Sequence, residues 1–397
     1  MTPNPWRADF PAISDHSTCM YFDNAATTQM PHAVITACHA TVTAGRASVG
    51  RGSHIWGERA TKQYADARAT VAAFLGAASP DEVIFTSGAT ASLNLVALSW
   101  GMANLRDGDE IIVGRHDHKS TVLPWRRLQA TLQERGIHLI FHELDSVGTG
   151  DYNVHQAREL VNERTRLLVL THVHNVFGVE TAVRRIRRAI GPAPRILLDA
   201  SQSVGHIPVD VGDLGVDFLA FSGHKLFADT GIGVLWVRAG QHDEVHPIFV
   251  GGDGSDPGAS LPARLEVGTP NLLGALSLAA AITYVQGIGV AAIKGYLTDL
   301  TFTLIDALRG LPGIEFLPGA AWITCREACG IVAFRVPGYD ATTLGDCMSE
   351  RGIFVRTGNH CLPGHEWDDS LRVSMHLYNT YDEIARFIAE LCTILAR

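Results

Sequence analysis

The sequence predicts an α/β fold, with a large domain built on a mainly parallel sheet between helices and a smaller α+β C-terminal domain. Short apolar, β-branched runs alternate with helical patterns, a rhythm typical of a parallel sheet wrapped by helices. These runs are continuously apolar, which indicates that both faces of the sheet are covered. With 397 residues, 46% of them hydrophobic and 18% charged, the chain is long enough for two domains and a large buried core.

The expected strands of the large sheet follow one another along the chain at 82–86, 110–113, 167–170, 196–198, 218–221 and 233–237. In open sheets of this kind, a ligand lies beyond the carboxyl ends of the strands. The residues just after each run are therefore the first candidates for function.

A Gly-, Asp- and Pro-rich stretch at 251–262 predicts a long loop, after which the character of the sequence changes. Helical patterns at 274–286 and 291–308 lead to strand candidates at 331–335 and 371–375 and to a closing helix from Tyr381. We therefore expect a large cofactor-binding domain over 21–270 and a small domain over 271–397. The N-terminal segment 1–20 is expected to pack with the small domain.

Charge and cysteine usage narrow the class of protein. The net charge is −9 and no long basic cluster interrupts it, which argues against nucleic acid or an anionic membrane as the main partner. Seven cysteines without a repeating framework, and a start that lacks a signal-like pattern, predict reduced thiols in the cytoplasm. No apolar run reaches the roughly twenty residues that a spanning helix needs.

Two charged residues stand at the ends of buried runs. Lys225 follows 218–221 after three small or polar residues, where a buried ammonium is costly unless it is deprotonated or bound covalently. Both options favour Schiff-base chemistry with an aldehyde cofactor, the alternative being a surface lysine. Asp199 follows 196–198, where a protonated pyridine nitrogen would supply the cation that a buried carboxylate needs, the alternative being a helix cap.

Small residues and histidines follow other strands. The turn Ser87-Gly88-Ala89-Thr90 is suited to hold a phosphate on backbone N–H groups and the Thr90 hydroxyl, or to act as an ordinary helix N-cap. His116 and His118 form one His-x-His pair, and His172 and His174 form another. Hydrogen bonding or stacking suits such histidines better than a metal, because neither pair has a third ligand at suitable spacing.

In this order the motifs resemble the class V aminotransferase group of fold-type I pyridoxal-phosphate (PLP) enzymes. Within that group they are most similar to the Suf-type (group II) cysteine desulfurases and selenocysteine lyases. The resemblance runs from Tyr21-Phe22-Asp23-Asn24-Ala25-Ala26 to Arg372-Val373-Ser374-Met375. It implies a fold-type I PLP enzyme that converts L-cysteine to L-alanine.

The resemblance also implies roles for individual residues. Lys225 would form the Schiff base with PLP, Asp199 would bind the pyridine nitrogen, and His118 would stack on the ring. Asn175 and Gln202 are implied near the ring hydroxyl. The implied phosphate residues are Gly88, Ala89, Thr90, Ser222 and His224. Thr269, within 266–271, is implied to reach the partner's cofactor site in a homodimer.

Cys361, in the segment 356–361, resembles the family's catalytic cysteine, and Arg372 resembles the arginine that clamps the substrate carboxylate. Transfer of sulfur to Cys361 would leave a persulfide, with a protein as a possible acceptor, and His118 would assist proton transfer. Arg356, His360 and His365 are expected to favour the thiolate. The implied substrate residues are Asn24, Ala25, His54, Asn175, Arg356 and Arg372.

Some positions depart from the family pattern. The loop between Cys361 and Arg372 looks short, Ala228-Asp229 stands in place of Gly-Pro, and Asn359-His360 stands in place of two histidines. A second hypothesis is therefore a PLP-dependent aminotransferase, epimerase or other C–S or C–Se lyase acting on a specialised amino acid. A catalytically silent sulfur carrier and a metal-dependent hydrolase are further alternatives.

Overall fold

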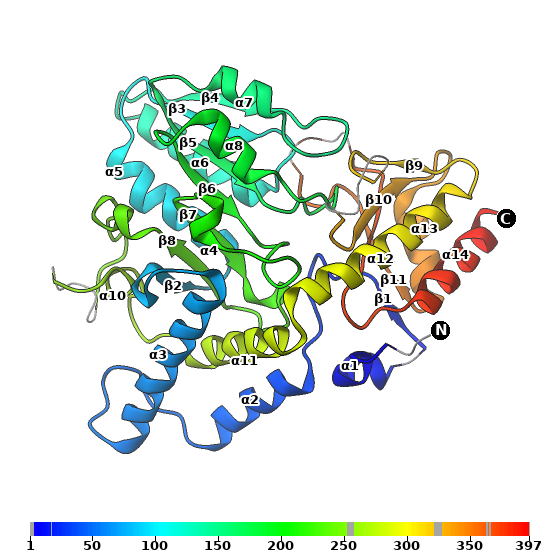
Figure 1. Cartoon of the computed structure of the whole chain (residues 1–397), viewed down its shortest axis with the longest axis horizontal. Helices are drawn as coiled ribbons and strands as arrows, with labels where there is room; N and C mark the ends of the chain where they lie inside the picture. The colour runs from blue at the N-terminus through cyan, green and yellow to red at the C-terminus, as the bar shows by residue number, and fades with distance from the viewer. Residues whose placement is uncertain are drawn as a thin grey trace.

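The computed structural model describes residues 4–16, 18–251, 258–320, 328–362, 364 and 367–396. In these residues a large sheet covered by helices lies beside a smaller sheet with its own helices (Figure 1). The large sheet consists of β2 Val83–Thr86, β3 Glu110–Gly114, β4 Ile140–Leu144, β5 Thr165–Thr171, β6 Arg195–Asp199, β7 Phe218–Ser222 and β8 Gly233–Val237.

The strand order is β2-β8-β7-β6-β5-β3-β4. Strands β7, β6, β5, β3 and β4 are parallel, whereas β8 runs antiparallel to both of its neighbours. The predicted α/β class with a mainly parallel sheet is confirmed. All six predicted strands are present, but β4 was missed: it is an edge strand in which only Leu144 is buried, so it lacks a continuous apolar run.

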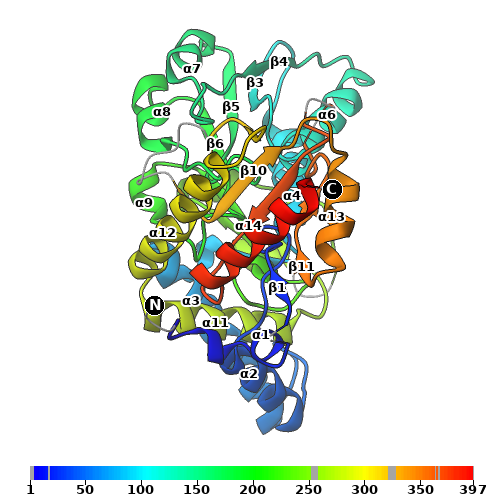
Figure 2. The ribbon, with the colours of Figure 1, turned by 90° about the vertical axis from the view of Figure 1, so that its right-hand side faces the viewer.

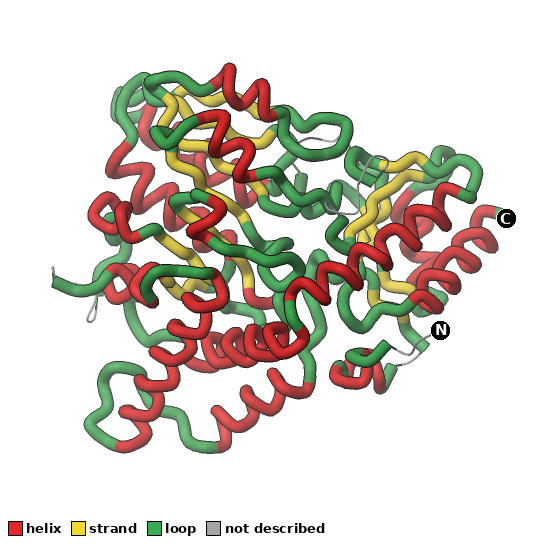
Figure 3. The backbone as a smooth tube through the Cα atoms, in the orientation of Figure 1, coloured by secondary structure: helices red, strands yellow, loops and turns green. Residues whose placement is uncertain are grey.

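Both faces of the large sheet are covered, as the continuous apolar runs predicted. Alternate residues of β5 enter opposite cores, Leu168 and Leu170 on one face and Leu167 and Val169 on the other. The first face is covered by α3 Ile55–Leu75, α8 Val183–Ile190 and α11 Leu272–Ile288, and the second by α4 Ala89–Val96 and α6 Lys119–Gln133. The strands thus lie between two helical layers (Figure 3).

Shorter or peripheral helices complete this part of the chain. They are α1 Pro11–Ser14, α2 His32–Thr43, α5 Met102–Asn104, α7 Val154–Leu160, α9 Val211–Leu214 and α10 Leu261–Leu265. The predicted loop 251–262 lies largely outside the described residues, and α10 begins at its end.

The smaller sheet has the order β12-β13-β10-β9, and its paired strands are antiparallel. Its strands are β9 Glu315–Phe316, β10 Ile331–Arg335, β12 Arg356–Thr357 and β13 Leu371–Ser374, and its helices are α12 Val290–Arg309, α13 Ala341–Ser349 and α14 Tyr381–Leu395. Figure 2 shows these helices packed around the strands. Helix α14 begins with a capping box between Thr380 and Glu383.

Helix α11 differs from its expected placement in the C-terminal domain. It packs against α2 and α3, and Ala275, Leu278 and Ile282 belong to the core of the large sheet. The chain passes to the smaller part along α12, because Ile293 and Leu297 still belong to the core of the large sheet whereas Leu300 and Leu304 belong to that of the smaller one. None of the described helices is by itself long and apolar enough to cross a membrane; only the bent pair α11 and α12, 77° apart, has the required length and composition together.

The N-terminal segment contacts both parts of the molecule. β1 Met20–Tyr21 pairs in parallel with β11 Ile353–Phe354 of the smaller part. Arg7 forms an ion pair with Glu383 of α14. Phe10, in contrast, packs on Phe227 beside the large sheet. The segment therefore ties the two parts together.

Candidate active site

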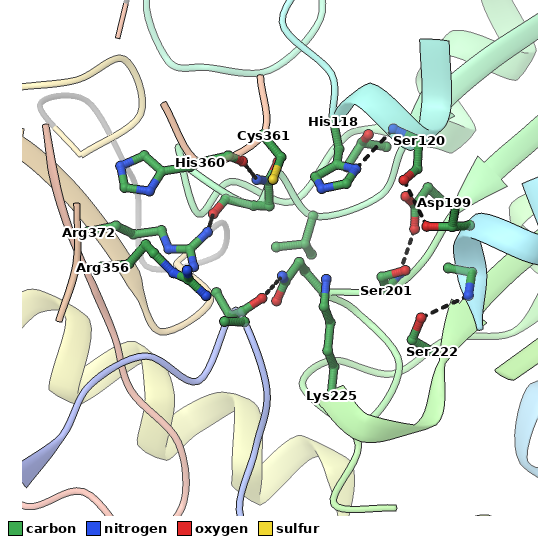
Figure 4. Close-up of a pocket in the computed structure, with 18 of the residues that line it drawn as sticks. His118, Ser120, Asp199, Ser201, Ser222, Lys225, Arg356, His360, Cys361 and Arg372 are labelled. Atoms are coloured by element: carbon green, nitrogen blue, oxygen red, sulfur yellow. Dashed lines mark hydrogen bonds between the residues drawn. The ribbon is translucent and has the colours of Figure 1, made fainter. Parts of the chain in front are cut away.

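One cavity of about 570 Å³ lies between the carboxyl ends of the parallel strands and the smaller part of the molecule. Of the residues predicted from the sequence, it is lined by Ala25, Ala89, Thr90, His118, Asn175, Asp199, Gln202, Ser222, His224, Lys225, Arg356, Cys361 and Arg372. Figure 4 shows the amine of Lys225 pointing towards His118, with Asp199 on one side and the two arginines on the other.

Lys225 is placed by the sharp end of β7. A 3-10 turn, Gly223–Lys225, follows the strand directly, and a Cβ at Gly223 would come within 2.7 Å of Ile232 Cγ2. The His224 carbonyl accepts from the backbone and hydroxyl of Thr28. Burial lowers the pKa of the Lys225 ammonium below its ordinary value, and the Asp199 carboxylate opposes that shift. The site therefore favours a neutral, nucleophilic amine.

Asp199 is the last residue of β6 and is 6% exposed. Its Oδ1 accepts from the Ser201 backbone N–H at 2.9 Å, and its Oδ2 accepts from Thr121 Oγ1 at 3.4 Å. It forms no ion pair with any described residue. A buried carboxylate in this state is suited to bind a cationic group of a ligand.

His118 is the N-cap of α6, where its Nδ1 accepts from the Ser120 backbone N–H at 3.1 Å. Burial lowers the pKa of the imidazole, an effect that the Lys225 charge strengthens and the Asp199 carboxylate opposes. A neutral ring whose Nδ1 accepts carries its proton on Nε2. His118 can therefore offer an N–H donor to the pocket.

The predicted phosphate turn lies at the N-terminus of α4. Ser222 Oγ accepts from the Ala89 backbone N–H at 2.8 Å, and Thr90 Oγ1 lies 2.8 Å from Ser120 Oγ. The turn approaches β8 so closely that a Cβ at Gly233 would come within 2.4 Å of Gly88 Cα. Backbone donors and hydroxyls at a helix N-terminus suit an anion.

Two amide side chains keep an oxygen unpartnered in the buried wall of the pocket. Gln202 donates from Nε2 to the Ala25 carbonyl at 2.7 Å, and Asn175 donates from Nδ2 to the His360 carbonyl at 3.0 Å. Neither Gln202 Oε1 nor Asn175 Oδ1 has a hydrogen-bond partner. Because such atoms are costly when buried, they mark places where a ligand donor fits.

Cys361 lies on the loop after β12, and its side chain is exposed to the pocket mouth. His360 and Cys361 have φ values of 53° and 63°, which are unfavourable for residues other than glycine. The loop is fixed to the large part because the Lys119 backbone N–H donates to the Cys361 carbonyl at 2.9 Å. The thiol is thus held over the same cavity as Lys225.

His360 was expected to favour the Cys361 thiolate, and burial means that it would have to do so without a charge. Burial lowers the pKa of His360 to about 3, so its ring is neutral, and its Nε2 lies 3.0 Å from Ser370 Oγ. Arg356 remains as a charged neighbour, whereas His365 lies outside the described residues.

Arg372 is a buried cation of the pocket wall. Its Nη1 donates to the Asn175 carbonyl at 3.0 Å, its Nη2 lies 3.2 Å from Asp23 Oδ1, and its Nε has no partner. Arg356 Nε lies 3.2 Å from Asp23 Oδ2. An unpartnered guanidinium N–H in a closed wall suits a carboxylate ligand.

Comparison with known proteins assigns this arrangement to a family. The model of the family "Aminotransferase class-V" matches residues 20–387. The chain belongs to the class V aminotransferase family. A cysteine desulfurase from Klebsiella pneumoniae is 37% identical over 97% of this chain and 96% of its own length.

Solved structures agree with that assignment. The apo cysteine desulfurase from Thermococcus onnurineus is 31% identical, with a TM-score of 0.89 over 99% of this chain and 98% of its own. A cysteine desulfurase from Escherichia coli, in an S-sulfonic acid form, is 28% identical, with a TM-score of 0.86 over 100% and 99%. The family is one of PLP-dependent enzymes.

The pocket of this class V aminotransferase fits PLP. Asp199 offers a carboxylate for a protonated ring nitrogen, Gln202 and Asn175 line the pocket and each keeps an unpartnered oxygen, and the α4 turn suits a phosphate. Lys225 supplies the amine for an aldehyde.

Four residues that were predicted to bind cofactor or substrate do not line the cavity. Gly88 lies just behind Ala89, next to Ser222. Asn24 is buried and donates to the Ser374 carbonyl at 2.7 Å, so it supports β13 rather than facing the pocket. His54 caps α3, and both it and Thr269 are exposed on this chain, so their assigned roles stay predictions.

The other histidines of the two His-x-His pairs have structural contacts. His172 Nδ1 lies 3.0 Å from Ser203 Oγ. His174 Nε2 lies 2.9 Å from the His116 carbonyl, and its ring stacks on Phe177. Among the described residues, no three His, Cys, Asp or Glu side chains are arranged to hold a metal ion.

Sequence reasoning missed Asp23 and Ser120. Ser120 lines the cavity and bonds Thr90, and Asp23 bonds both arginines. Asp23 lies within the motif 21–26 that carried the resemblance, so a carboxylate in that motif was a usable signal. Its partners, however, are more than three hundred residues away in the sequence.

Proposed function

We propose that the protein is a PLP-dependent cysteine desulfurase, which converts L-cysteine to L-alanine and transfers the sulfur to Cys361 as a persulfide. The observation that carries this proposal is the position of the exposed Cys361 thiol, which lines one cavity together with Lys225 and Arg372. The relatives named cysteine desulfurase, which match nearly the whole chain, support it.

Bound in this pocket, PLP would supply an electron sink for negative charge at the substrate Cα. Lys225 would bind it covalently, Asp199 would hold its ring nitrogen, and His118 would cover its ring. The implied hydroxyl contacts are Asn175 and Gln202, and the implied phosphate contacts are Gly88, Ala89, Thr90, Ser222 and His224. Burial lowers the pKa of His224 to about 4, so it would act as a neutral donor or acceptor.

Side chains of the pocket would bind the substrate, move its protons and accept its sulfur. The Arg372 guanidinium would bind the substrate carboxylate, with Arg356 beside it in the cavity wall. Lys225 Nζ would take the proton from Cα. Cys361 Sγ, as a thiolate, attacks the substrate sulfur: the S–S bond forms, the C–S bond breaks, and Cβ takes up a proton on the way to alanine. His118 Nε2–H is placed to donate a proton to the substrate.

We further propose that the active unit is a homodimer in which Thr269 completes the partner's phosphate site. The segment that carries Thr269 is anchored on its own chain by Glu266, whose carboxylate accepts from Arg68, Tyr64 and the Phe85 backbone N–H. A fixed segment that ends in an exposed threonine suits a contact with a second copy. The exposed Cys361 thiol likewise suits delivery of sulfur to an acceptor, a protein included.

The decisive experiment compares the wild-type holoenzyme with Cys361→Ala and Cys392→Ala. With L-cysteine, the wild type and Cys392→Ala should release alanine and add about 32 Da to the Cys361 peptide, the mass of one sulfur atom, and Cys361→Ala should do neither. Cys392 is a matched control because it is also exposed and belongs to α14. Full alanine and sulfur release by Cys361→Ala would refute the proposal, and ketoacid-dependent amino transfer would favour an aminotransferase instead.

A further inference from the structure

The Thr28 side chain holds the backbone on both sides of Lys225. Thr28 Oγ1 donates to the His224 carbonyl at 3.0 Å and accepts from the Phe227 backbone N–H at 2.8 Å. A hydroxyl has one proton to donate and lone pairs with which to accept, so both hydrogen bonds form at once. His224 directly precedes the lysine, and Phe227 follows it after one further residue. One buried hydroxyl therefore forms a clamp around the residue that carries the amine.

This clamp holds a backbone conformation that is unfavourable on its own. Phe227 has a φ of 63°, in the left-handed region that favours glycine. Strained residues of this kind persist only where the surrounding contacts over-determine them. The Phe227 ring packs on Phe10 and His376, and its buried N–H has the Thr28 hydroxyl as its acceptor. Removing that acceptor would leave a buried N–H unpaired at a strained position, which is costly.

Thr28 belongs to a segment that is itself fixed to other parts of the site. The Ala25 backbone N–H donates to Ser374 Oγ of β13 at 2.9 Å, and the Ala25 carbonyl accepts from Gln202 Nε2 at 2.7 Å. The Thr28 backbone N–H also donates to the His224 carbonyl, at 2.9 Å. Thr28 does not line the cavity, so it can influence the chemistry only through the residues that it holds.

We infer that Thr28 is a positioning residue for Lys225, because its hydroxyl fixes the His224 carbonyl and the Phe227 N–H and thereby the direction in which the lysine side chain enters the pocket. The Lys225 amine points into that pocket (Figure 4). Its two proposed tasks, attack on the aldehyde carbon of PLP and removal of the substrate Cα proton, both need accurate placement. A displacement of about 1 Å can slow such a step by about two orders of magnitude. This inference rests on the proposed function because it assigns both tasks to Lys225.

The first test follows the attachment of PLP to the apo protein. Thr28→Ala removes the hydroxyl without placing a methyl group against the Phe227 N–H, whereas Thr28→Ser keeps the hydroxyl. PLP reacts with Lys225 Nζ: the C=N bond forms and the aldehyde oxygen leaves as water. Borohydride stops the reaction at timed intervals, and mass spectrometry counts the Lys225 peptides that carry the cofactor. Attachment should be about tenfold slower in Thr28→Ala and should keep the wild-type rate in Thr28→Ser.

The second test isolates the proton transfer in the holoenzyme. L-Alanine is incubated with the protein in D2O, and NMR follows the loss of its Cα proton. The Cα–H bond breaks, the proton passes to Lys225 Nζ while the cofactor holds the electron pair, and a deuteron from the solvent then takes the proton's place. The exchange rate at saturating alanine should fall about tenfold in Thr28→Ala and be restored in Thr28→Ser.

Thr27→Val is the matched control. Thr27 Oγ1 donates to the same His224 carbonyl at 3.2 Å, but the Phe227 N–H bonds the Thr28 hydroxyl instead, so this variant keeps the clamp and should keep both wild-type rates. Thr28→Val preserves the side-chain volume and replaces Thr28→Ala if the smaller side chain prevents folding, as judged by melting temperature and near-UV circular dichroism.

Unchanged rates in a folded variant that lacks the Thr28 hydroxyl, or an equal loss in Thr27→Val, would overturn the inference and leave Thr28 a purely structural residue. Failure of the proposed function is distinguishable from this outcome, because neither test uses Cys361. A protein that releases no sulfur from cysteine would refute the desulfurase assignment, yet its rates of PLP attachment and of Cα proton exchange would still report on Thr28.

Discussion

At the scale of single residues, Asn175 links the two halves of the site. Its side-chain amide holds the His360 carbonyl next to Cys361, its backbone carbonyl accepts from Arg372, and its buried Oδ1 is free for a ligand. Asn175, in the loop after β5, thus contacts both the loop that carries Cys361 and the Arg372 side chain. Placing Cys361 and binding a cofactor are therefore coupled through this side chain.

Asn175→Asp should weaken that coupling. The aspartate cannot donate to the His360 carbonyl and would repel it, so the Cys361 loop should loosen. We expect alkylation of Cys361 by iodoacetamide to change in rate by more than about threefold, and kcat for sulfur release to fall by about two orders of magnitude. Exposed Cys392 serves as an internal control whose alkylation rate should not change. Unchanged Cys361 reactivity would show that the loop is held without Asn175.

At the scale of elements, the anchor of the Thr269 segment is a buried ion pair. Arg68 of α3 and Glu266 have side chains only 13% and 9% exposed, and the carboxylate also accepts from the Phe85 backbone N–H of β2. Removing one charge of such a pair leaves the other uncompensated.

Glu266→Gln should therefore lower the free energy of unfolding by about 3 kcal/mol, within the range for a broken buried pair. If Thr269 completes the partner's site, the variant should also release PLP faster and dissociate at higher protein concentration than the wild type, which sedimentation and cofactor fluorescence would measure. Exposed Glu163→Gln is the charge-matched control. If the variant is less stable but dimerises and releases PLP as the wild type does, then the ion pair stabilises the fold without supporting the proposed contact of Thr269 with the partner.

Elements with strong local signals were predictable from the sequence, and those defined by distant contacts were not. The runs behind β5, β6, β7 and β8 are apolar throughout because both faces are covered, so their existence and most of their bounds were predicted. Strand β4 was missed because its exposed edge carries His142 and Glu143. The assignment of α11 to the smaller part was also mistaken, because its apolar composition does not reveal which core receives it.

The same distinction holds in the site. Lys225, Asp199 and the Ala89 turn were found because each follows a recognisable strand. The neutral state of His360 depends on burial that the sequence does not display, and the contacts of Asp23 depend on arginines that are brought near by β12 and β13.

At the scale of the whole molecule, several buried histidines make stability depend on pH. Burial lowers the pKa of four of them to about 3 or 4, namely His172, His174, His206 and His360, and it also lowers the pKa of His376. In the unfolded chain each would titrate near 6.5. The unfolded state therefore binds more protons than the folded state below that pH, and stability falls as the pH falls.

We expect stability to be constant with respect to these groups above about pH 6.5 and to decrease between pH 6.5 and about 3, by at most about 1.4 kcal/mol per pH unit for each histidine. Denaturant unfolding at several pH values measures this slope. His206→Gln should flatten the slope, whereas His155→Gln, at a side chain 81% exposed, should not. Equal slopes in the wild type and His206→Gln would contradict this account.

The positive φ angles at His360 and Cys361 have a consequence for how this protein can vary. At both positions the backbone conformation costs an L-residue about 1 to 2 kcal/mol that glycine would avoid. Glycine at 361 would relax the turn, yet it would remove the thiol. Stability and activity therefore favour different residues at position 361. A laboratory selection for heat resistance alone would tend to replace the cysteine.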